Sequence, residues 1–384
     1  MHAYRRHTRF YRVMRFLIGP WCRWYFGLRA LPAPEVQGPL LVVANHTTDL
    51  DAIFVALSFP RHMYYVASEH IFRKPLLRRL FAYYLDPIAK RKGGADVSTS
   101  MQMLRRLKKG MNVMLFAEGN KSFHGETCPV HPATGALVRA SGATLVTVRL
   151  SGGYFSSPRW AHTLRRGRVT CAPVATYAPQ VLAAMSDAEV NALIRRDIDE
   201  DAYARQQEHP VAFRGRRLAE GIENALYLCP RCGGFGTVHG TGNRIACVCG
   251  LAATYEKTGF LTGENAPFET LAAWGDWQRG ALAERLAACG DAPLVQNGGQ
   301  AIVRILPDHA TQAVADGTLT LGRTGLACGG FHLPLADVLG LEIYGRNTIV
   351  FSDANGARYQ VKTAAERSGL AYFEAYALLR AERG

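Results

Sequence analysis

An apolar run breaks into a polar turn in the segment Leu40-Leu41-Val42-Val43-Ala44-Asn45-His46-Thr47-Thr48-Asp49-Leu50-Asp51. The apolar part has the composition of a buried strand. The threonines and aspartates predict a turn and a helix start, with Asp51 in the first turn of a helix that ends near Phe59. A histidine and an aspartate at this spacing can form a hydrogen bond in which the carboxylate fixes the imidazole tautomer. The segment therefore predicts a general base, His46 oriented by Asp51, at the carboxyl end of a strand, where open α/β sheets place their sites.

Taken alone, the spacing of His46 and Asp51 fits equally well a helix-capping aspartate beside a loop histidine. A second cluster of the same character lies downstream, in Asn112-Val113-Met114-Leu115-Phe116-Ala117-Glu118-Gly119-Asn120-Lys121-Ser122. It is again an apolar strand that ends in a polar turn, here with one glycine, one acid and one base. Two such turns in one chain favour a functional site over a simple helix cap.

The two clusters resemble the signatures of the glycerolipid acyltransferase family, the lysophosphatidic acid acyltransferases. The matching residues are Asn45, His46, Asp51, Phe116, Glu118, Gly119, Lys121 and Ser122. Two further blocks fit the family in order and spacing. Residues 87–91 resemble a strand that ends in a phosphate-contacting arginine, and residues 144–148 resemble the family's fourth, apolar block. The resemblance therefore covers residues 38–150. Ala117 replaces the usual proline, and Lys121 replaces the usual arginine, which keeps the charge but loses the planar fork for phosphate.

The resemblance implies transfer of a fatty acyl group from acyl-CoA or acyl-carrier protein to the free hydroxyl of 1-acylglycerol 3-phosphate. His46 and Asp51 are then catalytic, and Arg91 and Lys121 hold the phosphate. The implied substrate-binding set is Asn45, Arg91, Glu118, Gly119, Lys121 and Ser122. Glycerol 3-phosphate and lyso-lipids with other headgroups are alternative acceptors.

The composition is that of a basic protein with several domains. The chain has 384 residues, 48% of them hydrophobic, and a formal net charge of +14. This length predicts two or three domains, and the charge predicts a polyanionic partner such as an anionic membrane surface. Neither a transmembrane run nor a signal peptide is expected, because no apolar stretch is long enough.

Residues 1–34 contain seven arginines interleaved with aromatic and aliphatic residues, and no acid. This mixture is typical of an interfacial helix, with arginines at lipid phosphates and rings at headgroup level. Gly19-Pro20 predicts a break into two short helices. The alternative is a helix packed on the protein's own core with a solvated basic face. We expect an enzyme bound peripherally to the inner, cytoplasmic face of the membrane, and we do not expect nucleic acid as a partner.

Strand and helix patterns alternate from residue 40 to about residue 150. Predicted strands at residues 63–67, 87–91, 112–116 and 144–150 are separated by helical patterns at residues 71–85, 96–110 and 135–140. Residues 179–226 are helical in pattern. This alternation predicts an α/β domain with a largely parallel sheet.

Four cysteines form a compact pattern, Cys229-x2-Cys232 followed after fourteen residues by Cys247-x-Cys249. Thiolates on two tight turns can share one tetrahedral zinc ion. The pattern resembles a zinc ribbon and predicts a structural zinc, because four cysteine ligands leave no open position for catalysis.

After the cysteines, the pattern changes to a helix at residues 267–289, short strands between residues 300 and 362, and a closing helix from about Ala364. The predicted order is a membrane-associating arm (1–34), an acyltransferase domain (35–226), a zinc ribbon (227–258) and an α+β domain of unknown role (259–384). A non-catalytic zinc-ribbon adaptor for nucleic acid or protein is the rival function, but it leaves the paired motifs unexplained.

Overall fold

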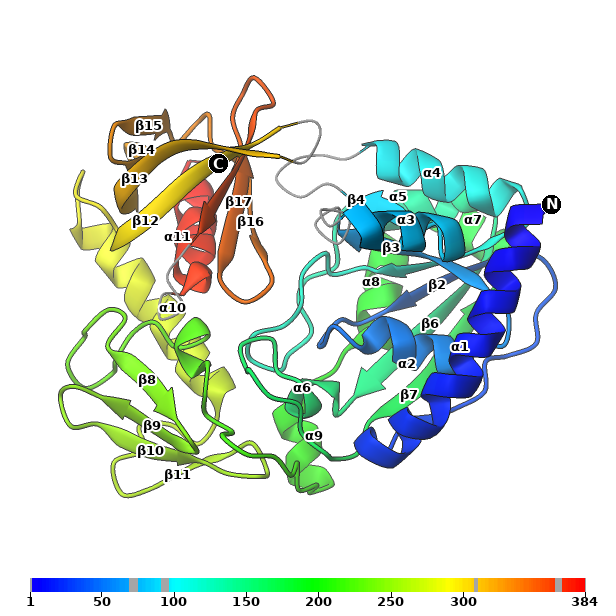
Figure 1. The fold of residues 1–384 in the computed structure, drawn as a ribbon, viewed down its shortest axis with the longest axis horizontal. Helices are drawn as coiled ribbons and strands as arrows, with labels where there is room; N and C mark the ends of the chain where they lie inside the picture. The colour runs from blue at the N-terminus through cyan, green and yellow to red at the C-terminus, as the bar shows by residue number, and fades with distance from the viewer. Residues whose placement is uncertain (1, 69–74, 91–96, 307–309, 363–367, 384) are drawn as a thin grey trace. The chain divides into compact units, whose positions relative to one another are not determined.

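The structure is a computed structural model that describes residues 2–68, 75–90, 97–306, 310–362 and 368–383 (Figure 1). The chain divides into two compact units. The first comprises the described residues up to Gly215 except 160–163, and the second comprises residues 160–163 and those from Arg216 onward. The boundaries of the four predicted segments stay a prediction.

The first unit is built on a seven-stranded sheet in the order β1-β7-β6-β2-β5-β3-β4. Its strands are β1 (Arg29–Ala30), β2 (Leu40–Ala44), β3 (Met63–Ser68), β4 (Ile88–Lys90), β5 (Asn112–Phe116), β6 (Thr144–Ser151) and β7 (Thr170–Tyr177). β2 pairs in parallel with β5 and β6, which confirms the predicted, largely parallel sheet. Only β7 runs antiparallel to its neighbour β6, and it lies in a stretch where the sequence predicted no strand.

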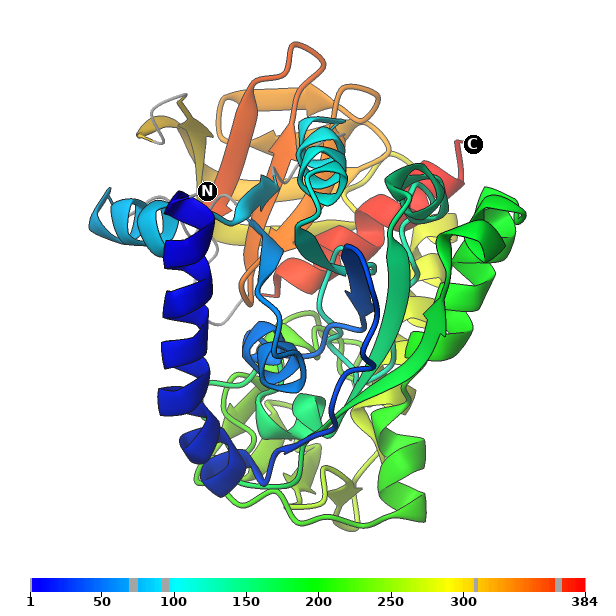
Figure 2. The ribbon, with the colours of Figure 1, turned by 90° about the vertical axis from the view of Figure 1, so that its right-hand side faces the viewer.

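Helices cover both faces of this sheet, so its central strands are apolar on both sides. Val42 and Ala44 pack toward α1 (His2–Phe26) and α2 (Asp51–Ser58), whereas Leu41 and Val43 pack toward the opposite helices. Figure 2 shows α1, in dark blue, and α8, in green, on opposite sides of the sheet. The other helices of the unit are α3 (Pro75–Tyr84), α4 (Val97–Lys108), α5 (Thr134–Ser141), α6 (Gly153–Ser156), α7 (Pro179–Ala183), α8 (Asp187–Ile198) and α9 (Ala202–Glu208).

The predicted break at Gly19-Pro20 is wrong, because α1 is one helix of 25 residues with Pro20 inside it. A proline inside a helix costs about 3 kcal/mol or more. Cys22 and Phe26 beyond it are fully buried in the core, and their burial offsets that cost. Pro20 lies on the exposed side of the helix, where water can donate a hydrogen bond to the backbone carbonyl that loses its amide donor at the proline. Within the described chain, no helix is both long and apolar enough to cross a membrane.

The second unit contains two antiparallel sheets. A four-stranded sheet carries the cysteines and is formed by β8 (Val238–Thr241), β9 (Arg244–Cys247), β10 (Ala252–Tyr255) and β11 (Leu261–Thr262), preceded by η2 (Ile222–Asn224). After α10 (Leu271–Ala288) come β12 (Val295–Ile305), β13 (Thr311–Gly322), β14 (Gly325–Cys328), β15 (Phe331–Pro334), β16 (Leu339–Tyr344), β17 (Thr348–Ser352) and β18 (Arg358–Lys362), closed by α11 (Gly369–Ala381). The predicted fold class is confirmed.

Candidate active site

His46 and Asp51 meet at the carboxyl end of β2, as the sequence predicted. His46 Nδ1 lies 2.9 Å from Asp51 Oδ2. The same oxygen accepts the backbone amides of Thr47 at 2.6 Å and Thr48 at 2.8 Å. An oxygen that accepts two amides acts as an acceptor, so Nδ1 of His46 is the protonated nitrogen of the ring. The other ring nitrogen, Nε2, is therefore the basic one.

The imidazole of His46 is held in a fixed orientation. Its ring stacks on Phe116 with the centroids 4.0 Å apart and the planes 9° from parallel. Burial lowers the pKa of His46 below its ordinary value, and the hydrogen bond that His46 donates to Asp51 acts in the opposite direction. A lowered pKa keeps the imidazole neutral at physiological pH, which is the state a general base needs.

Glu118 positions the backbone around His46 rather than projecting into open space. One carboxylate oxygen accepts the amide of His46 at 2.5 Å and the other accepts the amide of Cys128 at 2.5 Å. The side chain is buried, and burial raises the pKa of Glu118 to about 8 while the two amides act to lower it. Glu118 thus ties the end of β2 to the loop that follows β5.

Two other predicted substrate-binding residues are also engaged by the protein. Asn45 is fully buried, and its amide group bonds both to the carbonyl of Leu150 at 2.9 Å and to its N–H at 2.7 Å. The hydroxyl of Ser122 accepts the amide of Gly125 at 2.8 Å, and its own amide donates to the carbonyl of His46 at 3.2 Å. Both residues shape the site, and a direct contact with substrate stays a prediction for them.

Lys121 lies close to His46 and Asp51 and is paired with a residue that the sequence did not single out. Its ammonium group donates to Asp49 Oδ1. The lysine side chain is 10% exposed and that of Asp49 is 86% exposed. Buried Arg159 donates to the carbonyl of Lys121 at 2.9 Å and to Asn120 Oδ1 at 3.0 Å. Asp49 lies inside the first motif and could have been noticed there, whereas Arg159 follows the second motif by nearly forty residues without a sequence signal.

Gly119 gives this corner its backbone shape. Its φ of +70° is in the left-handed region that favours glycine. A Cβ at this position would lie 3.3 Å from the ammonium nitrogen of Lys90, at the end of β4. Lys90 and Lys121 therefore place two cations near the same turn. Arg91, the predicted phosphate ligand, lies outside the described residues.

The chain just after β6 packs closely against the loop that carries Thr47 and Asp51. A Cβ on Gly153 would lie 2.6 Å from Thr47 Oγ1 and 3.4 Å from Asp51 Oδ1. Only a residue without a side chain lets α6 come this near to the loop that carries Thr47 and Asp51. Neither motif includes this glycine, which lies 102 positions after Asp51.

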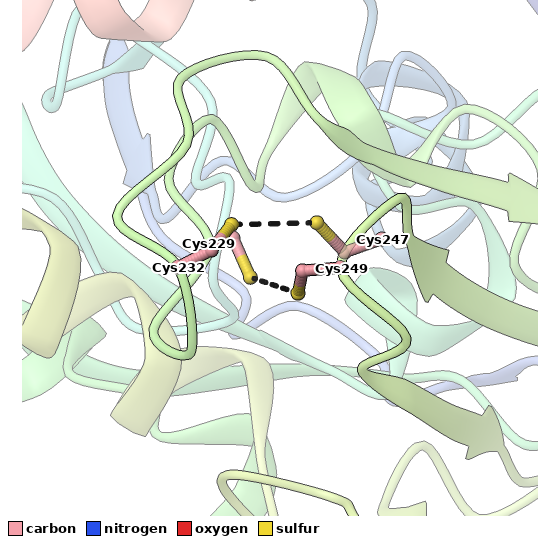
Figure 3. Close-up of side chains that lie close together, drawn as sticks. All are labelled: Cys229, Cys232, Cys247 and Cys249. Atoms are coloured by element: carbon pink, nitrogen blue, oxygen red, sulfur yellow. Dashed lines mark hydrogen bonds between the residues drawn. The ribbon is translucent and has the colours of Figure 1, made fainter.

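The four predicted metal ligands converge in the second unit (Figure 3). The Sγ atoms of Cys229, Cys232, Cys247 and Cys249 all lie within 4.8 Å of one another. Cys229 and Cys249 are 3.7 Å apart, and Cys232 and Cys247 are 3.8 Å apart. Zinc–sulfur bonds of about 2.3 Å in a tetrahedron require sulfur–sulfur edges of about 3.8 Å. The cluster therefore has the donors and the dimensions of a four-cysteine metal site.

Helix α10 fixes the turn that carries the first two cysteines. The indole of Trp274 donates to the carbonyl of Leu228 at 3.0 Å, and Gln278 bonds to Tyr227 N at 3.1 Å and Ala225 O at 2.8 Å. Both Trp274 and Gln278 are fully buried. The cysteine turn is thus built into the core of its unit.

One part of the chain matches a known protein family. Residues 26–151 match the family model described as Acyltransferase. Among solved structures, the chain is similar to the 1-acyl-sn-glycerophosphate (LPA) acyltransferase PlsC from Thermotoga maritima. That match has 18% identity and a TM-score of 0.43, and it covers 52% of this chain and 80% of that one. The region matched by the family model contains both motifs, so the match confirms the resemblance to acyltransferases that the motifs predicted.

Proposed function

We propose that this chain is an O-acyltransferase that esterifies 1-acylglycerol 3-phosphate with an acyl group from an acyl thioester. The observation that carries the proposal is the 2.9 Å contact between His46 Nδ1 and Asp51, which leaves Nε2 as the base. It lies inside the region that matches the acyltransferase family model. Glycerol 3-phosphate and lyso-lipids with other headgroups are the alternative acceptors.

The proposed reaction is a direct transfer. Nε2 of His46 takes the proton of the acceptor hydroxyl while its oxygen attacks the thioester carbonyl. The new carbon–oxygen bond forms, the carbon–sulfur bond breaks, and the thiolate leaves and takes up the proton from His46. Asp51 stabilises the transient imidazolium, as a carboxylate does in a catalytic triad. Positioning and one base suffice, so no acyl-enzyme is needed.

Lys121 is the proposed ligand for the acceptor phosphate. In the structure its charge is taken up by Asp49. A phosphate therefore has to displace the Asp49 carboxylate before it can bind the lysine. The Asp49 side chain is mostly in solvent and can turn away into water, while the buried lysine keeps an anionic partner in the phosphate. A dianionic phosphate competes well for the ammonium group, since it carries more charge and more acceptor atoms.

The surface of α1 supports a proposal for membrane binding. One side of α1 packs on the protein's own core through His7, Tyr11, Cys22 and Phe26. The alternative of a helix packed on the core therefore describes that side of α1 only. The other side exposes large apolar residues: Val13, Phe16, Leu17, Trp21 and Trp24. Exposed Arg5, Arg9, Arg12 and Arg23 lie along one flank of this stripe. Apolar residues flanked by arginines match an anionic lipid surface, and such a surface holds the lyso-lipid acceptor.

Vesicle binding tests this face. Phe16→Ser with Trp24→Ser should weaken cosedimentation with anionic phospholipid vesicles, and binding by the unchanged protein should fall as salt rises. Val181→Ser, which removes an exposed apolar residue on α7, is the matched control. Equal binding by both variants would mean that α1 does not contact the membrane. The predicted location at the inner face of the membrane stays a prediction.

We propose a structural zinc for the four cysteines. Cys229, Cys232, Cys247 and Cys249 would bind it as thiolates, and four protein ligands leave no open position for substrate. The ion would join the turn before β8 to the turn after β9. Chemistry at His46 does not involve it.

An acyl-transfer assay tests the proposed function. Purified protein is given a panel of acyl thioesters and lyso-lipids, and products are identified by mass. We expect a diacylglycerol phosphate product, and a loss of about 10²–10⁴ in rate for His46→Ala. His162→Ala, at an exposed histidine of the second unit, is the control. Product formation that survives in His46→Ala would exclude the mechanism, and no product with any pair would favour the adaptor function.

A further inference from the structure

A cavity of about 360 Å³ lies in the first unit beside the candidate active site. Its wall is formed by the end of β6, the start of β7 and helix α9, through residues such as Ser151, Thr170 and Gln206. Ligand pockets typically have volumes of about 300–1,000 Å³. No role for this cavity follows from the acyltransferase motifs, since most of its lining falls after residue 151, where the family match ends.

The cavity is lined by four arginines, Arg29, Arg149, Arg168 and Arg205. Two of them are used by the protein. Arg205 forms a two-pronged pair with Glu200 at 2.7 Å for both contacts, and Arg149 donates to the carbonyl of Asp197 at 2.9 Å, at the end of α8. Arg29 and Arg168 are exposed, and neither has an ion-pair partner within the described residues. The cavity therefore presents two uncommitted guanidinium groups.

Part of the remaining lining is apolar. Phe155 and Phe213 pack against each other with ring centroids 5.2 Å apart, and both contribute to the cavity wall together with Val174 and Val211. A ligand that fits must combine anionic groups with a flat apolar part. Guanidinium groups bind phosphates in a planar, two-pronged manner, and a nucleotide base offers the flat apolar part.

The cavity is close to the reacting atoms. Gly152 lines it, and the next residue, Gly153, is the one whose Cβ would lie 3.4 Å from Asp51 Oδ1. β7 is separated from β2 by one strand, β6. Neighbouring strands lie about 4.8 Å apart, so the cavity wall on β7 is about 10 Å from β2, the strand that precedes His46. A flexible pantetheine arm can cross that distance from a nucleotide to a thioester at His46.

We propose that this cavity binds the phosphorylated nucleotide of a coenzyme A thioester, so that coenzyme A delivers the acyl group. The proposal rests on the proposed acyl-transfer function and specifies its donor. An acyl-carrier protein brings only one phosphodiester and a folded surface that cannot enter a cavity of this size. Coenzyme A has both a base and several phosphates, which match the apolar wall and the two uncommitted arginines.

Calorimetry with the full chain tests the proposal without turnover. The probes are coenzyme A and adenosine 3′,5′-bisphosphate. Arg29→Ala and Arg168→Ala should each weaken binding of both probes by about tenfold, the effect of losing one charge-assisted hydrogen bond. Arg168→Lys should restore part of the affinity because it keeps the charge. Arg195→Ala, at an exposed arginine of α8 outside the cavity, is the control and should not change binding.

Steady-state kinetics complete the test. The same variants should raise the KM for acyl-CoA and leave the KM for the acceptor unchanged. Equal coenzyme A binding by the unchanged protein and by a variant that combines Arg29→Ala with Arg168→Ala would overturn the proposal. So would a loss of activity confined to the carrier-protein donor.

Failure of the cavity and failure of the proposed function give different results. Acyl transfer with a donor KM that does not change in the Arg29 and Arg168 variants would exclude the cavity as the coenzyme A site and would still support the proposed acyl-transfer function. Arginine-dependent binding of coenzyme A without any acyl transfer supports the cavity and removes the proposed reaction.

Discussion

Replacing Asp51 by asparagine tests how the carboxylate supports His46. A single oxygen of Asp51 accepts the imidazole N–H and the amides of Thr47 and Thr48. The carbonyl oxygen of an asparagine can take that position, with its NH₂ group directed toward Thr47 Oγ1, which lies 3.5 Å from the other carboxylate oxygen. The ring orientation and tautomer are then retained, and only the negative charge is lost.

The expected loss follows from that charge. Hydrogen bonds to charged groups contribute about 1.5–3 kcal/mol, and neutral ones about 0.5–1.5 kcal/mol. The difference of about 1–2 kcal/mol corresponds to a factor of about 5–30 in rate. The charge of Asp51 also raises the pKa of His46 against the effect of burial. Its removal should move the acidic limb of the pH–rate profile downward by about one pH unit, since one unit equals 1.36 kcal/mol.

The assay follows thiol release from an acyl thioester between pH 5 and pH 9, with kcat/KM fitted at each pH. In the unchanged protein the acidic limb should lie below pH 6.5, because burial lowers the pKa of His46. Asp49→Asn makes the same chemical change two residues away and should move the limb less than Asp51→Asn does, because Asp49 bonds Lys121 and raises the pKa of His46 less than Asp51 does.

Two results would refute this reasoning. A fall in rate of more than about 10³-fold would mean that the imidazole of His46 changes its tautomer, as happens in catalytic triads when the aspartate becomes asparagine. An unchanged rate and an unchanged limb would mean that Asp51 does not support the base.

Three further predictions concern other parts of the chain. Asp49→Asn should lower the KM for a phosphate-bearing acceptor several-fold, because it frees Lys121; an unchanged or raised KM in steady-state kinetics would place the phosphate elsewhere. Metal analysis should find about one zinc per chain, and Cys247→Ser should lower the melting temperature of the second unit before it lowers acyl transfer; zinc-free folded protein would contradict this. Burial raises the pKa of Glu374 to about 7, so its contribution to stability is present at acidic pH and lost as pH rises through 7. In urea unfolding, the free energy of unfolding of Glu374→Gln should therefore rise relative to that of the unchanged protein by up to about 3 kcal/mol between pH 4.5 and pH 8. A difference in unfolding free energy that stays constant over this range would show that the carboxyl titrates normally.

The sequence by itself determined the parts of this protein that depend on short spacings. His46 and Asp51 are five residues apart across a strand, a turn and a helix start, and local geometry alone brings them within hydrogen-bonding distance. The two cysteine pairs are likewise local turns, and only their meeting required the fold. Alternating strand and helix patterns predicted the parallel sheet because parallel strands need helical crossovers.

Only the tertiary structure decided the features that depend on distant residues. Local propensity predicted that α1 breaks at Pro20, but burial of Cys22 and Phe26 outweighs the cost of the proline. Lys121 stands where the family usually has an arginine, and only the structure shows that its partner is Asp49, 72 residues away. The cavity of Arg29 and Arg168 exists because β1 and β7 pair and α9 covers their end. Such contacts leave no periodic pattern in the chain, since each is set by packing between elements that are separate in sequence.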